Sequence, residues 1–282
     1  MERDINPKFS TDDLRPLGRT GLAVAPLGLG TVKLGRNEQV KYPRSFSIPD
    51  DNQARELLAC AHEYGLNLID TAPAYGTSEA RLGRLIKGQR DSWIIASKVG
   101  EEFVDGQSVF DFSTQHTRAS VERSLKRLNT DRLDIVLVHS DGDDERILNH
   151  SGTLDMLKTL KNEGKIRAIG FSPKTEAGAI QAMHTSDVLM LTLNLREQTM
   201  KGVLARAHAQ EIGVLIKKGL QSGHVASDDR GSSAMAADPI ETSFRFIFDQ
   251  PGVSSIVIGT LSPAHLRHNV TMALRALSAT RL

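Results

Sequence analysis

The stretch NLIDTAPAYGTSEARLGRLI, residues 67–86, contains a complete strand, loop and helix. An apolar run ends on the carboxylate of Asp70, and Tyr75 follows in the loop. A helix is expected to begin at Thr77 or Ser78, because either hydroxyl can accept a hydrogen bond from a free backbone N–H of the first turn. Two interpretations remain open for this unit: a capped turn, or half of an active site.

The same alternation of a short apolar run with a helical segment recurs along the chain. Several runs, such as DIVLVH at residues 134–139, are almost entirely apolar, which is typical of parallel strands covered on both faces. The expected strands are Leu27–Gly30, Asn67–Asp70, Trp93–Ser97, Asp134–His139, Ile166–Phe171, Asp187–Leu193, Gly213–Lys217 and Ser255–Gly259. Eight such units predict a (β/α)8 TIM barrel that takes residues 1–282 as a single domain.

The expected helices have apolar side chains spaced so that they lie on one face, and residues typical of helix ends. Gly65, for example, follows the first helix where a left-handed residue is needed, and Pro263 suits the first turn of the last helix. The helices are expected at 51–64, 78–87, 114–128, 152–163, 175–184, 199–210 and 239–249, with a last one that opens at Ser262 and Pro263. Amphipathic helices of this kind would cover the outside of the barrel.

A doubly wound open sheet is the main rival to the barrel. That fold usually carries a glycine fingerprint after its first strand, but GLGTVKLG (28–35) has Lys33 at the third required position. Residues 1–13 are expected to be a flexible N-terminal segment, followed by a small β-hairpin around Gly18–Gly21 that closes the bottom of the barrel.

Three connections are long for a compact domain, and long loops are usually functional. They are Thr31–Asp50, Gly100–Ser113 and Gly219–Asp238. The third is rich in Ser, Gly and Asp, which suits a mobile cover over a ligand. Side chains on these loops would decide which substrate is accepted.

Composition narrows the class of protein. The chain has 35 basic and 34 acidic residues without a block of one sign, so neither nucleic acid nor an anionic membrane is an expected partner. A single cysteine excludes an internal disulfide, and no metal site is expected. No signal peptide is expected, because the first residues lack an apolar core, and no apolar run is long enough to span a membrane. These features predict a cytoplasmic protein that acts on a small molecule.

Polar side chains follow several of the expected strands. Asp70 ends the second, Lys98 the third (ASKVG), His139 the fourth (VLVHS) and Ser172 the fifth (GFSPK). Each alone has a structural explanation, such as a turn residue or a core histidine. In a (β/α)8 barrel the carboxyl ends of the strands share one rim, so these side chains and Tyr75 are expected to meet there.

Such a set has a defined chemistry. A tyrosine hydroxyl has a pKa of about 10, and an ammonium within ~4–6 Å lowers it by favouring the phenolate. Asp70 would hold Lys98 in place, and a neutral His139 could donate a hydrogen bond to a carbonyl oxygen. Tyr75 would then act as a general acid toward a carbonyl oxygen. Reduction of a carbonyl also needs two electrons, which none of these side chains supplies, so a hydride donor is implied.

The motifs NLIDTAPAYGTSE, ASKVG and DIVLVHS, in this order and spacing, resemble those of the aldo-keto reductases. The resemblance extends from RPLGRTGLAVAPLGLGT near the start to GTLSPAHLRHNV near the end. It implies a (β/α)8 barrel that acts as a monomer and reduces an aldehyde or ketone with a nicotinamide cofactor, NADP(H) rather than NAD(H). It also implies Tyr75 as proton donor, Lys98 as the group that lowers its pKa, Asp70 as the partner of Lys98, and His139 as the group that orients the carbonyl.

The resemblance further implies a set of cofactor contacts. They are Gly30, Thr31, Asp70, Ser172 and Lys217 near the nicotinamide, Ser222 and Gly223 at the pyrophosphate, and Gly259, Thr260, His265 and Asn269 at the adenosine end. The chain departs from the family pattern at Pro173, at Met190 and at Lys217, which replaces a stacking tyrosine. Gly259 and His265 stand where many members have a lysine and an arginine for the 2′-phosphate, which leaves Arg267 or His268 as substitutes.

Two other functions remain open. The first is a regulatory protein that binds the nicotinamide cofactor with little turnover, which the three departures favour. The second is a lyase that forms a Schiff base on Lys98, but this requires an amine without a tight counter-ion, and Asp70 argues against it.

Overall fold

A computed structural model describes residues 6–225 and 238–280 of the chain. Eight strands pair in parallel and close into a barrel, because the last strand of the series pairs with the first. In barrel order they are β3 (Leu27–Gly30), β4 (Leu68–Asp70), β5 (Ile94–Val99), β8 (Leu133–His139), β9 (Ile166–Ser172), β10 (Val188–Thr192), β11 (Gly213–Lys217) and β12 (Val253–Ile258). The predicted (β/α)8 barrel is therefore confirmed, and the open-sheet alternative is wrong.

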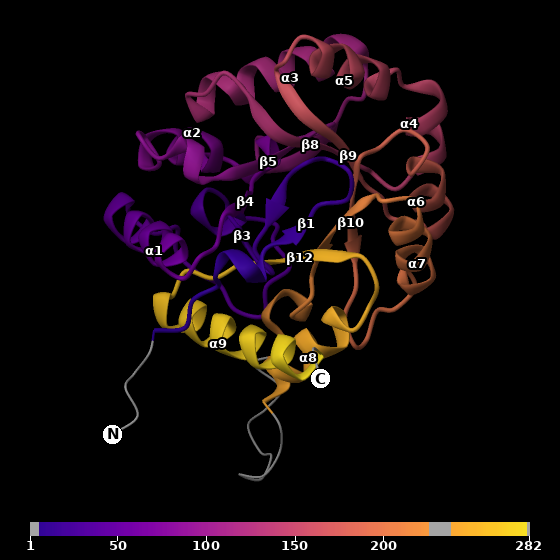
Figure 1. The fold of residues 1–282 in the computed structure, drawn as a ribbon. Coiled ribbons are helices and arrows are strands. Elements are labelled where there is room, and N and C mark those ends of the chain that lie inside the picture. Colours follow the sequence, from indigo (N-terminus) through magenta and orange to yellow (C-terminus); the bar gives the residue numbers. More distant parts are fainter. Residues whose placement is uncertain (1–5, 226–237, 281–282) are drawn as a thin grey trace, which may run out of the picture.

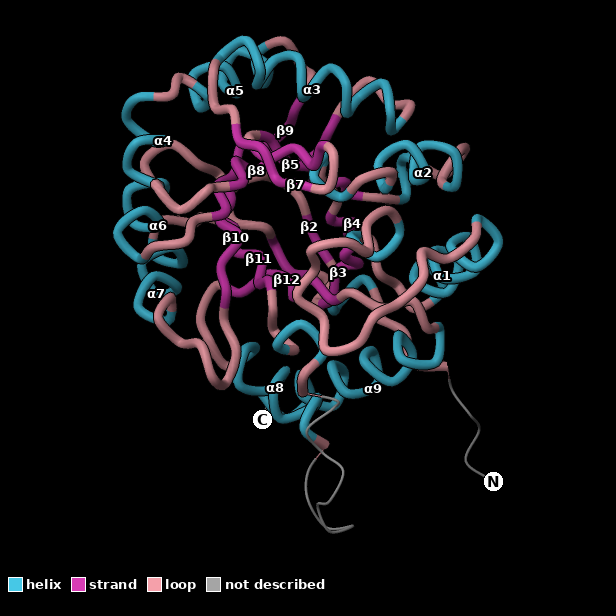
Figure 2. Tube along the Cα trace, turned by 180° about the vertical axis from the view of Figure 1, so that it is seen from behind, coloured by secondary structure: helices cyan, strands magenta, loops and turns pink. Residues whose placement is uncertain are grey.

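Helices surround the barrel as a ring (Figures 1 and 2). They are α1 (Asp51–Glu63), α2 (Ser78–Leu85), α3 (Thr114–Leu128), α4 (Asp144–His150), α5 (Thr153–Asn162), α6 (Glu176–Ala182), α7 (Lys201–Ala209), α8 (Pro239–Phe248) and α9 (Pro263–Thr280). The sequence predicts all of them except α4, which begins where the Asp143 side chain accepts a hydrogen bond from the backbone N–H of Arg146. No helix in the described stretches is both long and apolar enough to cross a lipid bilayer.

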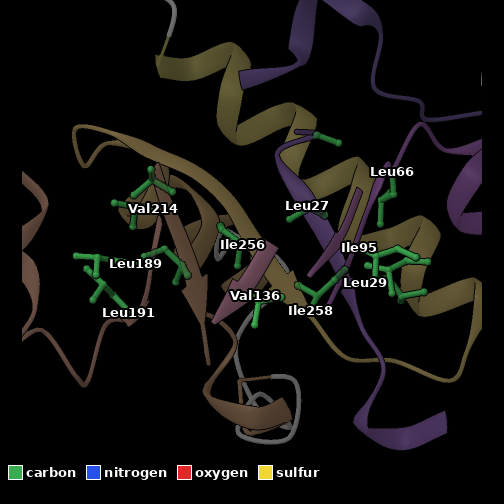
Figure 3. Packing of buried hydrophobic residues seen from close by; sticks show 14 of the residues in the cluster. Leu27, Leu29, Leu66, Ile95, Val136, Leu189, Leu191, Val214, Ile256 and Ile258 are labelled. Atoms are coloured by element: carbon green, nitrogen blue, oxygen red, sulfur yellow. The ribbon is translucent and has the colours of Figure 1, made fainter. Parts of the chain in front are cut away.

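The larger hydrophobic core fills the space between the strands and the helices. Outward-facing side chains of the barrel, among them Leu29, Ile95, Val136, Leu189 and Ile256, are buried in it (Figure 3). Each of these strands is covered by helices on one side and by the barrel interior on the other, which explains why the strands read as nearly continuous apolar runs.

A second, smaller cluster fills the inside of the barrel. Leu17, Leu22 and Val24 pack there against side chains of the strands, including Leu68 and Leu137. The first three come from the N-terminal hairpin of β1 (Arg15–Pro16) and β2 (Ala23–Val24). The predicted hairpin is confirmed, and it plugs the bottom of the barrel, so that the open mouth is at the carboxyl ends of the strands.

Of three segments predicted as loops or flexible ends, one contains strands and two lie partly outside the described residues. The connection 100–113 contains a hairpin of its own, β6 (Glu101–Val104) and β7 (Gln107–Phe110). Of the predicted flexible segment 1–13, residues 1–5 lie outside the described residues, whereas Phe9 is buried and its N–H donates to the carbonyl of Tyr64. Most of the cover predicted at 219–238 also lies outside the described residues.

Candidate active site

Asp70, Tyr75, Lys98 and His139 meet at the open mouth of the barrel and line one cavity of about 580 Å³. Asp70, Lys98 and His139 lie at the carboxyl ends of β4, β5 and β8. Tyr75 ends a 3-10 turn in the loop after β4. The structure thus brings together the four side chains that the sequence predicts to converge.

Asp70 and Lys98 form a buried ion pair. The Lys98 Nζ lies 2.5 Å from Asp70 Oδ1 and also donates to the carbonyl oxygen of Thr71 at 2.9 Å. Both side chains are at most 5% exposed. Thr31 anchors the end of β4, since its N–H and its hydroxyl both donate to the Asp70 carbonyl oxygen. Loss of either member of such a pair would leave an uncompensated charge in the cavity wall.

Tyr75 is held beside this pair. Its hydroxyl donates to Asp70 Oδ2 at 3.3 Å, and the Lys98 Nζ lies 4.6 Å from the centre of its ring. Burial raises the pKa of Tyr75 well above 10, and the negative charge of Asp70 raises it further. This direction is opposite to the predicted one, because burial and the Asp70 carboxylate both act on the same hydroxyl.

The loop that carries Tyr75 requires glycine at the next position. Gly76 has a φ of +60°, and a Cβ there would lie 2.3 Å from the carbonyl oxygen of Gly35. The same carbonyl accepts the N–H of Thr77. The connection after β3 and the loop after β4 are thereby locked together, which fixes the direction of the tyrosine.

His139 contacts a carboxylate that the sequence did not single out, Glu101. Its Nδ1 lies 2.7 Å from Glu101 Oε2, an ion-pair distance, although the approach is not in line with the ring N–H direction of an ideal hydrogen bond. Burial lowers the pKa of His139. Glu101 acts in the opposite direction, while Lys98 and Lys217 lower it further, so that the net direction is down. His139 is therefore neutral at neutral pH.

Glu101 lies at the start of β6, where the β6–β7 hairpin turns back over the rim. Its Oε1 accepts a hydrogen bond from the Ser108 hydroxyl at 2.6 Å, and Arg36 lies 3.9 Å away. Burial raises the pKa of Glu101, but His139, Ser108 and Arg36 outweigh burial and bring it to about 2. The sequence signal for this carboxylate is the acidic pair after KVG, Glu101 and Glu102. Its position could not be predicted, because the segment was expected to be a loop and instead forms a hairpin.

Lys217, at the end of β11, faces the cavity from the opposite side. Its Nζ donates to the Ser172 hydroxyl at 2.7 Å. Burial lowers the pKa of Lys217 to about 8, and the charges of Lys218, Lys98 and Lys174 contribute in the same direction. Lys174 and Lys218 also line the cavity, and neither was predicted from the sequence.

Most of the predicted cofactor contacts lie in the wall of this cavity. Those that do are Gly30, Asp70, Ser172, Lys217, Ser222, Gly223, Gly259 and Asn269. Thr31 and Thr260 are buried behind the wall, and His265 is exposed on α9. His268, one of the two substitutes for a 2′-phosphate contact, lies 2.9 Å from Asp238 Oδ2, and the other, Arg267, is half-buried on α9.

The charges in the wall fit an anionic ligand such as a dinucleotide. Five lysines line the cavity against the two carboxylates Asp70 and Glu197, and Asp70 is already paired with Lys98. The buried side chain of Asn269 lies at the α9 side of the same cavity. Phosphate groups would find cations there, and an adenine would find an amide.

Comparison with known proteins agrees with this architecture. The sequence model of the aldo/keto reductase family matches residues 26–236, a range that includes the four converging side chains. A Pseudomonas aeruginosa protein classed among the aldo-keto reductases has a structure with a TM-score of 0.86 to this one, at 53% identity over 98% of this chain and 99% of that chain. L-galactose dehydrogenase of Arabidopsis thaliana is 30% identical over 92% of this chain and 87% of its own length. NADH-specific methylglyoxal reductase of Escherichia coli is 26% identical over 90% and 91% of the two chains.

Proposed function

Because this chain belongs to the aldo/keto reductase family, we propose that it is an NADP(H)-dependent oxidoreductase that reduces an aldehyde or ketone to an alcohol, with Tyr75 as the proton donor. The observation that carries this proposal is the position of the Tyr75 hydroxyl, which lies in the cavity wall within 3.3 Å of the Asp70 carboxylate that pairs with Lys98. The ammonium of Lys98 would stabilise the phenolate that forms when Tyr75 gives up its proton.

The protonation state of Tyr75 suits the reductive direction. The phenol is fully protonated at neutral pH, so the proton is available when negative charge develops on a carbonyl oxygen. As the proton leaves, the nearby ammonium of Lys98 stabilises the phenolate, and Asp70 keeps that ammonium in position. Stabilising the phenolate is equivalent to lowering the pKa of the phenol, so Lys98 acts against the rise that burial and Asp70 cause.

A nicotinamide cofactor would supply the hydride that these side chains lack. In this chain Ser172 and Lys217 would lie against the nicotinamide end, Ser222 and Gly223 against the pyrophosphate, and Asn269 against the adenine. The excess of lysines in the cavity wall supports an anionic cofactor. We infer a preference for NADP(H), with Arg267 on α9 as the cation for the 2′-phosphate.

The two alternative functions receive less support. Schiff-base formation needs a free neutral amine, and Lys98 is held at 2.5 Å by Asp70. A binding protein without turnover would not need a tyrosine hydroxyl, a lysine and a carboxylate in contact at the mouth of the cavity.

The proposal is tested by fluorescence titration with NADPH and NADH, followed by turnover measurements with a panel of aldehydes, ketones and sugars. Methylglyoxal and L-galactose belong in the panel, because two relatives are named for them. We expect tighter binding of NADPH and a loss of about 10²–10⁴ in turnover for Tyr75→Phe, with unchanged cofactor affinity. A Tyr75→Phe protein with full turnover would contradict the role of Tyr75, and equal weak binding of both cofactors would contradict the cofactor assignment.

A further inference from the structure

We propose that Arg36, on the connection between β3 and α1, is a positioning residue for the phenol of Tyr75. Its guanidinium holds the turn that carries the tyrosine against the β6–β7 hairpin, and this keeps the hydroxyl directed at the mouth of the cavity. Arg36 lies behind the cavity wall, so it acts through the backbone of the turn. The inference rests on the proposed function, because that function makes Tyr75 the proton donor.

The first step is the hydrogen bond from Arg36 to the turn. Its Nη1 donates to the carbonyl oxygen of Ala74 at 3.0 Å. Ala74 is buried and directly precedes Tyr75 in the 3-10 turn Pro73–Tyr75. A buried carbonyl oxygen needs a donor, and an ionised donor makes a stronger hydrogen bond than a neutral one. Arg36 therefore restrains the backbone one residue before the phenol.

The second step is that the guanidinium is itself fixed in place. Its Nε donates to the carbonyl oxygen of Glu38 at 2.9 Å, and its Nη2 donates to that of Gln39 at 3.4 Å. Its flat face lies over the ring of Phe103 in β6, with 3.6 Å between Cζ and the ring centre. The side chain is only 9% exposed. A planar fork can make these contacts together, whereas the point charge of a lysine cannot.

The third step is the dependence of the phenol on its backbone. The N–H of Thr77 donates to the carbonyl oxygen of Gly35, and a Cβ at Gly35 would lie 2.3 Å from the carbonyl oxygen of Tyr75. Gly35 and Arg36 thus grip the turn on both sides of the tyrosine. The hydroxyl has a long hydrogen bond, 3.3 Å to Asp70 Oδ2, which leaves the direction of the ring to the turn beneath it.

The expected consequence is a loss in the rate of proton transfer. A proton donor must lie within hydrogen-bonding reach of the oxygen that it protonates, and a misplacement of about 1 Å can cost about 10²-fold in rate. Arg36→Met removes both the charge and the fork, while Arg36→Lys keeps the charge and removes the fork. Positioning predicts a similar loss in both variants, whereas an effect of the charge alone predicts full rescue by lysine.

Arg90→Met is the matched control. Arg90 is 16% exposed, donates to the backbone carbonyl oxygens of Trp93 and Arg132, and pairs with the buried Asp134. These contacts lie where β5 and β8 begin, at the end of the barrel opposite the cavity. Arg90→Met should therefore destabilise the fold at least as much as Arg36→Met, but it should leave kcat unchanged.

The hold on the ring is measured by NMR of the full-length protein, without cofactor or substrate. The chain has three tyrosines, so ¹³C-labelled tyrosine gives a small set of ring signals, and Tyr75→Phe identifies those of Tyr75 by their loss. We expect ¹³C relaxation to show a more mobile Tyr75 ring in Arg36→Met and in Arg36→Lys than in the wild type and in Arg90→Met. Equal mobility in the wild type and Arg36→Met would overturn the proposal.

Turnover is measured at saturating cofactor and substrate, with the best substrate of the panel. We expect kcat to fall by about 10–100-fold in Arg36→Met and in Arg36→Lys, without a matching change in the Kd for NADPH. Full kcat in either variant would overturn the positioning role. If circular dichroism shows that both are unfolded, Phe103→Leu replaces them. It removes the surface under the guanidinium and should lower kcat severalfold, and an unchanged kcat would again overturn the proposal.

Failure of this inference differs from failure of the proposed function. Full turnover in Tyr75→Phe would contradict the proton donor itself. A strong loss in Tyr75→Phe together with full turnover in Arg36→Met would contradict only the role of Arg36. In a protein that turns over no member of the panel, the relaxation of the Tyr75 ring would still decide whether Arg36 holds it.

Discussion

Lys98 and Lys217 face the same cavity from opposite sides of the barrel, but their partners differ in charge. Lys98, on β5, forms an ion pair with Asp70 at 2.5 Å. Lys217, on β11, donates to the neutral hydroxyl of Ser172, and among residues 6–225 and 238–280 no carboxylate forms an ion pair with it. Burial lowers the pKa of Lys217 to about 8. The two lysines therefore differ in whether a carboxylate compensates the cost of burying the ammonium.

The largest difference is expected in stability. Lys98→Met leaves the buried Asp70 carboxylate without its counter-ion, which should cost about 3–5 kcal/mol of unfolding free energy. Lys217→Met removes an ammonium whose burial disfavours the folded state at neutral pH, so it should leave the unfolding free energy unchanged or raise it. Urea unfolding followed by circular dichroism measures both. Equal losses in the two variants would show that the ion pair contributes nothing beyond packing.

The pH dependence of stability gives the next largest effect. Lys217 has a pKa of about 8 in the folded protein, against an ordinary value of 10.5. Between these two values the unfolded chain holds a proton that the folded protein has released, so the unfolding free energy contributed by Lys217 rises as the pH rises. The gain should be on the order of 2–3 kcal/mol across this window.

The measurement compares wild type with Lys217→Met by urea unfolding at about pH 7.5, just below the window set by the two pKa values, and at about pH 10, inside it. The difference between the two proteins should grow in favour of the wild type as the pH rises. A constant difference would mean that Lys217 titrates in the folded protein as it does in the unfolded chain.

The two sides of the cavity also differ in how far the sequence predicts them. Asp70, Lys98 and His139 could be placed together, because each ends an apolar strand and parallel strands of a barrel end on one rim. Glu101 could not, since its contact with His139 depends on how the β6–β7 hairpin folds back over the mouth. Thr31, which the sequence predicts as a cofactor contact, donates its hydroxyl to the Asp70 carbonyl oxygen.

Energetic detail was the least predictable feature. Proximity of Lys98 to Tyr75 suggested a lowered pKa for the phenol, and the proximity itself is present. The result has the opposite sign because burial and the Asp70 carboxylate act on the same hydroxyl. The helix α4 was not predicted for a comparable reason. The stretch before it is polar and is typical of a loop, and the first turn is stabilised by the side chain of Asp143, which caps it.

The smallest expected effect concerns the cofactor, because the charge of Lys217 should act differently on the oxidised and the reduced nicotinamide. If the nicotinamide lies against β11, as the proposed function requires, a protonated Lys217 repels the cationic oxidised ring and leaves the neutral reduced ring unaffected. Lys217→Met should therefore lower the ratio of Kd for NADP⁺ to Kd for NADPH by about fivefold at pH 7. In the wild type the same ratio should fall as the pH rises through about 8, where Lys217 loses its charge, and in Lys217→Met it should stay constant.

Fluorescence titration with each cofactor form measures the ratio directly, without turnover. A ratio that is the same in both proteins at every pH would place the nicotinamide away from Lys217, and the contrast between the two lysines would then be one of stability alone.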